Sequence, residues 1–507
     1  MTTYFIGIDI GTQGVRVVLV DEAGTVQGSE QIVFELTDRS REEQSPRQWW
    51  EGTRRCLAAL LSGLAAEVSL QNIRSVAVTS TSGTVIPLDR HHEPLHDALM
   101  YSDPRPAAEG KHCREVAQAF HPAGYTGFNA SSGLSKMVWF GRNFPEQTTH
   151  IHTWVHAADY ITGKLSGNFR IPDYTNALKS GYDLQHARWP AYLFEHLPLH
   201  REWMQTVVPS GQPIGPLLPA LAAEFGLPPI MVVAGMTDGC ASQIASGAVR
   251  PGDWNTTIGT TLVVKGVTTR ELIDPEGRLY SHRHPEGYWM PGGASNIGAD
   301  WITTGGFGGR LPELNAAAAG LIPTPHVAYP LRQEGERFPF ISPLARGFAP
   351  ESLADAELFA ANMEGVAYVE RYAYELIETL SDEPVRAVYT AGGASNSDVW
   401  LTIRSNVLKR PVYKCAQVTG AVGAAVLAAS QTHFGSLTEA AQAMTQVEKE
   451  VRPSPELMRA YDSGYAAFLR IMREKGFIKP VRETSRPLRS DTLSGAVAES
   501  GFVPFNE

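Results

Sequence analysis

An aspartate and a glycine-bearing turn stand together near the start of the chain. Asp9 ends an apolar run, and the turn GTQG at 11–14 follows before a second β-branched run begins at Val15. Backbone N–H groups in such a turn can face phosphate oxygens, and a neighbouring carboxylate can hold Mg²⁺ through water. The pattern therefore predicts a site for the phosphate tail of a nucleotide. An ordinary β-hairpin with a surface aspartate is the structural alternative.

The elements on either side of this turn exclude two commoner phosphate-binding motifs. A P-loop or a dinucleotide-binding fingerprint runs from a strand into a helix. Here the turn runs from one strand into another, and no GxxxxGK[ST] segment occurs in the chain. The phosphate site is therefore expected on a hairpin.

Two further glycine turns follow later in the chain. The segment TTIGTT at 256–261 precedes an apolar strand, 262–264. The segment TAGGAS at 390–395 follows the apolar stretch 387–389, and SDVWLTIRSNVL behind it is typical of a helix. Three such turns, spread over nearly four hundred residues, predict two lobes that close on one nucleotide.

A row of hydroxyl side chains, TSTSGT at 79–84, follows the predicted strand 73–78. Short hydrogen-bonding side chains at the end of a strand are suited to binding a polyol. A solvated turn is the alternative, and composition alone favours it.

Asp238 is a candidate base. It follows the predicted strand 230–234 and Gly235, and it begins a helix-like run about twenty residues before the second glycine turn. Aspartate at this place is first of all a helix N-cap. Its position at a predicted lobe boundary also allows its carboxylate to face the cleft and accept a proton.

Two pairs of histidines have spacings that could ligate a metal. His152 and His156 are four residues apart on a possible helix, and His282 and His284 are two apart on a possible strand. No carboxylate or cysteine completes either set. Packing or surface roles are therefore favoured for all four.

Length and composition set the broad class. A chain of 507 residues is too long for one core, so two large domains are expected. The net charge is −10 and no Lys/Arg-rich run occurs, which argues against a nucleic-acid or anionic-membrane partner. No apolar stretch is long enough to span a membrane. The four cysteines are scattered without a C-x-x-C pair, as suits a reducing cytoplasm.

The order of the elements predicts three units. Residues 1–246 form a first α/β unit, 247–433 a second, and 434–507 a helical extension with a tail. We expect helices over 356–380, 419–430 and 435–475. Small residues in the second of these permit close helix packing. The polar, proline-broken end, 478–507, is either a loose tail or an arm on a partner subunit.

Together these motifs resemble the FGGY carbohydrate kinases, which belong to the actin-like ATPase superfamily. The resemblance covers all but about the last thirty residues. FIGIDIGTQGVRVVLVD and TTIGTTLVVK look like the two phosphate motifs of the family. VYTAGGASNSDVW looks like its adenosine motif, and TGAVGAAVLAA looks like its inter-lobe helix. GERFPFISPLARGF at 335–348 is similar to the loop before the second family pattern. SKMVWFGRN at 135–143 nearly fits the first, although Gly133 stands where Pro, Ser or Thr is usual.

The resemblance implies an α/β fold with two actin-like ATPase (ribonuclease H-like) domains around a central cleft. It implies ATP and Mg²⁺, with Asp9 holding the metal through water and Asp238 acting as the base. The residues implied to flank the nucleotide are Thr12, Gln13, Gly259, Thr260 and Thr261 at the phosphates, and Gly392, Gly393 and Asn396 at the adenosine. Those implied to bind the sugar are Ser82, Gly83, Thr84, Asp103, Arg105 and Asp238.

The substrate expected from the resemblance is a pentulose. TSGTV, YSHR and DYTNALKSGYD look like pentulose kinases of the ribulokinase and xylulokinase type, and we expect D-ribulose ahead of D-xylulose. A kinase for another polyol such as glycerol is one alternative. A sugar-responsive binding protein without turnover and a polymer-forming or chaperone-like ATPase are two others. We expect a cytoplasmic homodimer with a small-molecule sugar as its ligand.

Overall fold

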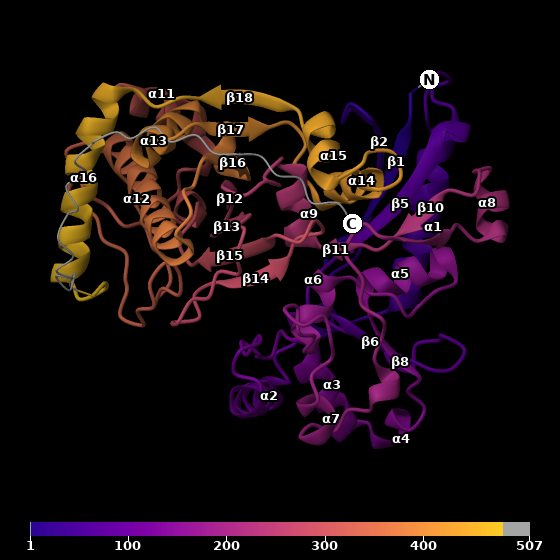
Figure 1. Ribbon diagram of the computed structural model, residues 1–507. Helices are drawn as coiled ribbons and strands as arrows, with labels where there is room; N and C mark the ends of the chain where they lie inside the picture. The colour runs from indigo at the N-terminus through magenta and orange to yellow at the C-terminus, as the bar shows by residue number, and fades with distance from the viewer. Residues whose placement is uncertain (1, 480–507) are drawn as a thin grey trace, which may run out of the picture.

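The computed structural model describes residues 2–479, which fold into two lobes, each built on a mixed β-sheet (Figure 1). In the first sheet the strand order is β3-β2-β1-β5-β10-β9, and β11 pairs with β5. Its strands are β1 (Tyr4–Gly11), β2 (Gly14–Asp21), β3 (Val26–Val33), β5 (Ile73–Ser80), β9 (Pro213–Pro216), β10 (Met231–Val233) and β11 (Met236–Thr237). Alternating β-branched residues favour strands, and the glycine turn at 11–14 joins the first two as predicted.

The second sheet has the strand order β14-β15-β13-β12-β16-β17-β18. Its strands are β12 (Asp253–Ile258), β13 (Leu262–Gly266), β14 (Tyr280–Arg283), β15 (Trp289–Ser295), β16 (Ala387–Ala391), β17 (Val412–Cys415) and β18 (Val447–Val451). Both sheets use one pattern: an antiparallel hairpin, a third antiparallel strand, and then strands parallel to the first. The predicted class, α/β with two ribonuclease H-like domains, is confirmed.

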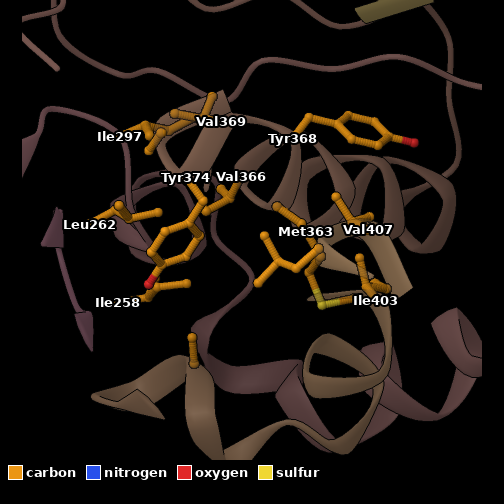
Figure 2. Packing of buried hydrophobic residues seen from close by; sticks show 14 of the residues in the cluster. Ile258, Leu262, Ile297, Met363, Val366, Tyr368, Val369, Tyr374, Ile403 and Val407 are labelled. Atoms are coloured by element: carbon orange, nitrogen blue, oxygen red, sulfur yellow. The ribbon is translucent and has the colours of Figure 1, made fainter. Parts of the chain in front are cut away.

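Helices bury the outer face of each sheet. Over the first sheet lie α1 (Pro46–Ser62), α5 (Ala157–Ser166) and α8 (Pro219–Phe225). Over the second lie α10 (Asp300–Thr304), α11 (Leu311–Ala319), α12 (Asp355–Ser381), α13 (Asp398–Leu408) and α16 (Pro455–Glu474). Figure 2 shows Val366 and Tyr374 of α12 packed near Ile258 and Leu262, the residues on either side of the second glycine turn.

A buried ion pair fixes the third glycine turn from behind. Arg404 of α13 donates two hydrogen bonds of 2.7 Å to Glu370 of α12, and neither side chain is exposed. Arg404 also donates to the Thr390 hydroxyl at 2.6 Å, at the end of β16. A bidentate arginine–carboxylate pair has a fixed geometry. Because Arg404 also binds Thr390, this pair holds the end of β16, and the turn that follows it, in place.

A four-stranded sheet extends the first lobe, at the bottom of Figure 1. Its strands are β4 (Glu43–Gln44), β6 (Val85–Leu88), β7 (Ala98–Leu99) and β8 (Thr153–His156). The helices of this extension are α2 (Ala107–Phe120), α3 (Gly133–Asn143), α4 (Pro145–Thr148), α6 (Tyr174–Ala177) and α7 (Tyr192–Glu195). Gly133 at the start of α3 has no room for a side chain, because an added Cβ would lie 2.6 Å from the Ser180 hydroxyl.

Two helices, α9 (Asp238–Ala245) and α14 (Gly420–Ser430), fill the space between the lobes. The contact is close: a Cβ on Gly7 of β1 would lie 1.8 Å from the Ala421 carbonyl oxygen of α14. A Cβ on Gly423 would lie 1.9 Å from the Ala241 carbonyl oxygen of α9. The small residues of α14 therefore serve packing, as predicted.

Two predicted elements are wrong. Residues 435–475 are not one helical region, because α15 (Leu437–Met444) and α16 enclose β18 on the edge of the second sheet. The strand reads VEKEV, and charged residues of this kind suit both helices and exposed sheet edges. His152 and His156 are not on one helix either. The run between them is β8, and His156 caps α5.

The helices predicted over 356–380 and 419–430 are confirmed as α12 and α14. None of the helices among residues 2–479 is long and apolar enough to cross a membrane. The division into units at 1–246, 247–433 and 434–507 stays a prediction. The stretch from 480 to 507 lies outside the described residues.

Candidate active site

Two carboxylates meet where three parallel strands end. β1 and β11 both pair with β5 in parallel, with Asp9 opposite Thr79 and Thr237 opposite Ser80. Asp238 follows directly as the first residue of α9. Crevices outside the carboxyl ends of parallel strands are the usual place for ligands in such sheets. The two aspartates that the sequence singled out, some 230 residues apart, therefore share one edge.

Asp9 is buried without a full set of partners. Its Oδ1 has no hydrogen-bond partner among the described residues. Its Oδ2 lies at the N-terminus of α14, since a Cβ on Gly420 would be 2.9 Å away. Burial and then the charge of Asp238 raise the pKa of Asp9 to about 7, opposed by Arg16. A bound cation would offset both effects.

Asp238 is also buried, and burial raises its pKa. Three neighbours oppose the shift: the Gly239 N–H, which donates to Oδ1 at 2.6 Å, and the positive charges of Lys265 and Lys179. Asp238 is not the N-cap of α9, because Thr237 occupies that position. Its carboxylate is thus free of the capping role that the sequence allowed.

Both aspartates line one cavity of about 670 Å³ together with the first glycine turn. The predicted phosphate contacts Thr12 and Gln13 lie on its wall. The other lining residues are Gly11, Leu36, Thr37, Asp38, Arg41, Thr81, Tyr101 and Ser102. The structure thus brings the predicted metal ligand, the predicted base and part of the predicted phosphate site into one space.

This carboxylate pair fits Mg²⁺. The ion usually keeps several waters and binds through one or two carboxylates. The unpartnered Oδ1 of Asp9 supplies such a ligand, with Asp238 close enough to raise its pKa. No group of three or more potential metal ligands occurs within residues 2–479. The residues therefore suit a hydrated ion and not a cage of protein ligands.

The second and third glycine turns leave the second sheet side by side. β12 and β16 are parallel neighbours, with Thr257 opposite Ala391, so Gly259 to Thr261 and Gly392 follow adjacent strand ends. Gly392 has φ +86°, and a Cβ there would lie 2.5 Å from the Ile258 carbonyl oxygen. Only glycine fits this left-handed, crowded position.

A second cavity, of about 480 Å³, adjoins the third turn. Two of the predicted adenosine residues, Gly393 and Asn396, lie on its wall. Its other lining residues are Ile302, Leu311, Pro312, Asn315, Ala316, Ala319, Phe359, Ala394, Ser397, Asp398, Val399 and Trp400. Such a mostly apolar slot beside a backbone turn suits a flat aromatic base.

The predicted sugar edge at 79–84 is held by its own hydrogen bonds. The Thr81 and Thr84 hydroxyls are 2.8 Å apart, and Thr84 Oγ1 accepts from the Tyr101 N–H at 3.1 Å. Gly83 has φ +90°, and a Cβ would lie 2.2 Å from the Ser131 carbonyl oxygen. The buried Ser82 hydroxyl has no partner among the described residues, so it is the group left free for a ligand.

Asp103 and Arg105 form an ion-pair network in the first lobe. Arg105 donates to both Asp103 oxygens at 2.9 Å and lies 2.8 Å from a Glu43 oxygen. Its guanidinium also covers the Trp139 ring at 4.6 Å. A Glu42 oxygen lies 3.7 Å from its guanidinium, so Arg105 already has three carboxylate partners, and Asp103 is 1% exposed. A sugar contact for either residue stays a prediction.

Sequence reasoning missed the positive side chains near Asp238, namely Lys265 and Lys179. Lys265 is the last residue of the segment TTLVVK, and alternation along β13 was the available signal. Leu262 and Val264 are buried in the core of the second lobe, so Val263 and Lys265 point to the opposite face, toward the cleft.

Comparison with known proteins places the chain in a family. The N-terminal domain model of the FGGY family of carbohydrate kinases matches residues 4–245, and the C-terminal domain model matches 254–432. The chain is 26% identical to xylulose kinase of Escherichia coli K12, over 96% of this chain and 99% of that one. It is 24% identical to gluconokinase of Bacillus licheniformis, over 81% and 84%. The crystal structure of xylulose kinase from Rhodospirillum rubrum superposes with a TM-score of 0.82 and 26% identity, covering 93% and 98%.

The chain belongs to the FGGY family of carbohydrate kinases. It is an ATP-dependent sugar kinase, and the two lobes have the actin-like ATPase fold. The expectations of family, fold and enzyme class are confirmed.

Proposed function

We propose that this kinase phosphorylates the terminal hydroxyl of a pentulose, with D-xylulose ahead of D-ribulose. The observation that carries the proposal is the pair of buried carboxylates at the strand edge beside the hydroxyl segment 79–84. Relatives named xylulose kinase, matched over nearly their whole length, support the choice of sugar. Their names favour D-xylulose, which reverses the order expected from sequence motifs alone.

Asp238 takes the proton in this proposal. The hydroxyl oxygen of the sugar attacks the γ-phosphorus of ATP, the bond from that phosphorus to the β,γ-bridging oxygen breaks, and ADP leaves. The hydroxyl proton passes to the Asp238 carboxylate. A base must be ionised to do this, and the Gly239 N–H with Lys265 and Lys179 favours the ionised form against burial. The free Ser82 hydroxyl and Thr81 orient the sugar, with Gly83, Thr84 and Asp103 shaping the loop around it.

The three glycine turns hold the nucleotide. Thr12 and Gln13 face the phosphates from the first lobe, while Gly259, Thr260 and Thr261 face them from the second. Gly392, Gly393 and Asn396 flank the adenosine beside the apolar cavity. Asp9 would hold Mg²⁺ through water, and the bound ion would supply charge neutralisation at the transferred phosphate. Positioning and charge neutralisation supply most of the catalysis in phosphoryl transfer.

A homodimer and a cytoplasmic location are further parts of the proposal, and both come from the sequence. Light scattering on the purified full chain measures the first directly. A mass corresponding to one chain at micromolar concentration would contradict it.

The substrate is tested by ADP release with D-xylulose, D-ribulose, L-xylulose, L-ribulose and glycerol, each at several concentrations. We expect the highest kcat/KM with D-xylulose and no ADP release above background for Asp238→Asn. Higher kcat/KM with glycerol than with any pentulose would overturn the proposal. ADP release that no sugar stimulates would favour a binding protein or another ATPase of the superfamily.

A further inference from the structure

The strand that leads into Asp238 is unusually short. β11 consists of Met236 and Thr237, and among the described residues it pairs with β5 alone. Strands in globular proteins usually have about 3–10 residues, so β11 needs further contacts to hold its position. Because Asp238 is the next residue, any movement of β11 would also move the Asp238 carboxylate.

Two threonine hydroxyls hold the backbone of β11 from opposite sides. On the side of β5, the Thr79 hydroxyl donates to the Met236 carbonyl oxygen at 2.9 Å. On the other side, the Thr237 N–H donates to the Thr175 hydroxyl oxygen of α6 at 2.8 Å. Thr237 and Thr175 are both buried, and a buried backbone N–H needs an acceptor. The Thr175 hydroxyl therefore takes the place that a neighbouring strand would have.

Asp173 fixes the orientation of this hydroxyl. Since the Thr175 oxygen accepts from Thr237, its own single proton is available for a second bond, and it donates to Asp173 Oδ1 at 2.6 Å. Asp173 is the N-cap of α6 and accepts from the N–H groups of Thr175 and Asn176 at 2.7 and 3.3 Å. Its carboxyl group also accepts from the Asn176 side-chain amide at 2.5 Å and the Ser210 hydroxyl at 3.1 Å. Both carboxyl oxygens are thus bonded, which leaves Asp173 and Thr175 one arrangement.

The backbone that supports Asp173 is bonded to the segment that leads into β11. Val208 forms a parallel bridge with Asp173. Shortly after it, the Gly211 N–H donates to the Ala234 carbonyl oxygen at 2.8 Å. Ala234 continues through Gly235 into β11. A shift of β11 would therefore break either these backbone bonds or the bond between Thr237 and Thr175.

Neither Thr175 nor Asp173 lies on the wall of the cavity that Asp9 and Asp238 share, and both side chains are 0% exposed. They can influence the reaction only through the position of Asp238. A general base must lie within hydrogen-bond reach of the proton that it takes. A displacement of about 1 Å can lower a reaction rate about a hundredfold. The contact with Thr237 is therefore at a place where small shifts matter.

We propose that Thr175, oriented by Asp173, is a positioning residue that sets the place of the Asp238 carboxylate relative to the acceptor hydroxyl. The inference rests on the proposed role of Asp238 as the base. Neither Thr175 nor Asp173 takes up the proton, and the bonds that form and break are those of the phosphoryl transfer described above. The segment DYTNALKSGYD at 173–183 thus contributes to the reaction through its first and third residues.

The test removes the hydroxyl and then restores it. Thr175→Val should lower kcat about ten- to a hundredfold, measured where chemistry limits the rate and with the acceptor that has the highest kcat/KM in the sugar panel. The KM for ATP and the KM for the sugar should each change less than about twofold. Thr175→Ser keeps the acceptor oxygen and should recover kcat to within about threefold of the wild type. A kcat for Thr175→Val within about twofold of the wild type would overturn the inference.

Thr153→Val is the matched control for the loss of a buried hydroxyl. The Thr153 hydroxyl is 0% exposed and donates to the Trp203 carbonyl oxygen at 3.0 Å, in the extension of the first lobe. This variant should leave kcat unchanged even where its Tm falls. An equal fall in kcat for both variants would show a general effect of lowered stability and would overturn the inference. If Thr175→Val does not fold, Thr175→Ala removes the same acceptor without placing a methyl group against the N–H.

Two further measurements show where Thr175 acts. Amide hydrogen exchange in 231–240, followed by mass spectrometry, should be faster in Thr175→Val than in Thr175→Ser or the wild type, since the Thr237 N–H has lost its acceptor. Asp238→Glu keeps the carboxylate but displaces it by one methylene group, so Thr175→Val should cost much less in that background. Unchanged exchange, or equal fold-losses in both backgrounds, would mean that Thr175 does not act through Asp238.

The outcomes separate this inference from the proposed function. Loss of turnover in Asp238→Asn with full turnover in Thr175→Val would overturn the inference and leave the base assignment intact. Full turnover in Asp238→Asn would overturn the base assignment, and the inference with it. Loss in both variants, with recovery in Thr175→Ser, supports both.

Discussion

The two lobes present the same hairpin to the cleft with one decisive difference. β1 and β2 meet at Gly11, and β12 and β13 meet at Gly259, each followed by a threonine. Two residues before the glycine the first hairpin has Asp9, whereas the second has Thr257. The Thr257 hydroxyl accepts a hydrogen bond from the Asn255 amide at 3.1 Å. The first hairpin offers a charged ligand and the second a neutral hydroxyl.

This difference indicates that the two hairpins bind one phosphate chain in different ways, the first through a cation and the second through neutral groups. A cation needs a carboxylate, and Asp9 supplies it from one lobe. The phosphate oxygens are themselves negative, so a second carboxylate facing them from the other lobe would repel them. Amides and hydroxyls at the second hairpin bind phosphate without that cost. A third group, the Asp238 carboxylate, belongs to neither hairpin.

Asp238→Asn should cause the largest loss. The change keeps the shape of the side chain and removes the proton acceptor, and general-base catalysis is typically worth about 10²–10⁴-fold. We expect kcat to fall by this factor in steady-state ADP release while the Kd for ATP stays nearly unchanged. More than about a third of wild-type turnover, measured where chemistry limits the rate, would exclude Asp238 as the base.

Asp9→Ala should come next and should differ in kind. Without its carboxylate the ion is held less well and the γ-phosphate is poorly placed, so kcat/KM should fall by about 10²-fold or more. A titration with excess Mg²⁺ should recover part of the loss, which it would not do for Asp238→Asn. If Asp9→Ala had wild-type activity and a wild-type Mg²⁺ dependence, Asp9 would have only a structural role in the hairpin.

Thr257→Asp would make the second hairpin resemble the first. If the neutral hydroxyl is needed there, the added charge should raise the KM for ATP by about ten- to thirtyfold through repulsion across a partly screened distance. Thr257→Asn, which has nearly the same shape without the charge, is the control and should have a much smaller effect. Equal effects of the two variants would mean that the size of the side chain at position 257, and not its charge, determines ATP binding.

The pH dependence should report the carboxylate of the first hairpin. With the pKa of Asp9 raised to about 7, kcat/KM should fall about tenfold per unit as pH drops below that value. Excess Mg²⁺ favours the ionised form and should move this fall to lower pH. A kcat/KM that stays constant from pH 8 to pH 5.5 would contradict the requirement for an ionised Asp9.

Thermal unfolding provides a second readout of the same group. A carboxyl whose pKa is raised on folding stabilises the fold below its unfolded pKa, and this contribution is lost as pH rises through about 7. Asp9→Asn should therefore gain Tm relative to the wild type as pH increases from 5 to 8, in the absence of nucleotide and Mg²⁺. A constant difference across that range would show that the carboxyl titrates normally.

Ser82→Ala should give the smallest effect. The free hydroxyl contacts only the sugar in our proposal, and a neutral hydrogen bond is worth about 1 kcal/mol, or about fivefold. The KM for D-xylulose should rise by about this factor while the KM for ATP stays the same. Equal changes in both constants would remove Ser82 from the sugar site.

Local sequence patterns predicted the parts of the site that lie on the backbone. The three glycine turns and the strand ahead of Asp238 follow from apolar runs and glycine positions, which depend on neighbours in sequence. The contribution of Lys265 was missed because it depends on Gly292 of the neighbouring strand, where a Cβ would lie 2.9 Å from Lys265 Cγ. The sugar role expected of Arg105 stays a prediction. Its carboxylate partners include Glu42 and Glu43, about sixty residues earlier, which no local pattern connects to it.

The strand β18 shows the same limit at the level of an element. Its charged sequence is compatible with a helix, and only the free edge of β17 makes it a strand. The histidines of β8 and β14 were judged by their spacing. Their surroundings, a capping position for His156 and a buried, unpaired place for His282, are set by tertiary packing.

The position of α14 also determines when the first lobe can be completed during synthesis. This helix covers the inner face of the first sheet, against Phe5, Val18 and Ala77, although it begins at residue 420. At about 5–20 residues per second, a ribosome needs about ten to forty seconds to go from β11 to this helix. Throughout that interval the apolar inner face of the first sheet is not covered, because α14 has not yet been synthesised. The nascent first half is therefore a natural client for chaperones, and truncations before residue 420 should aggregate.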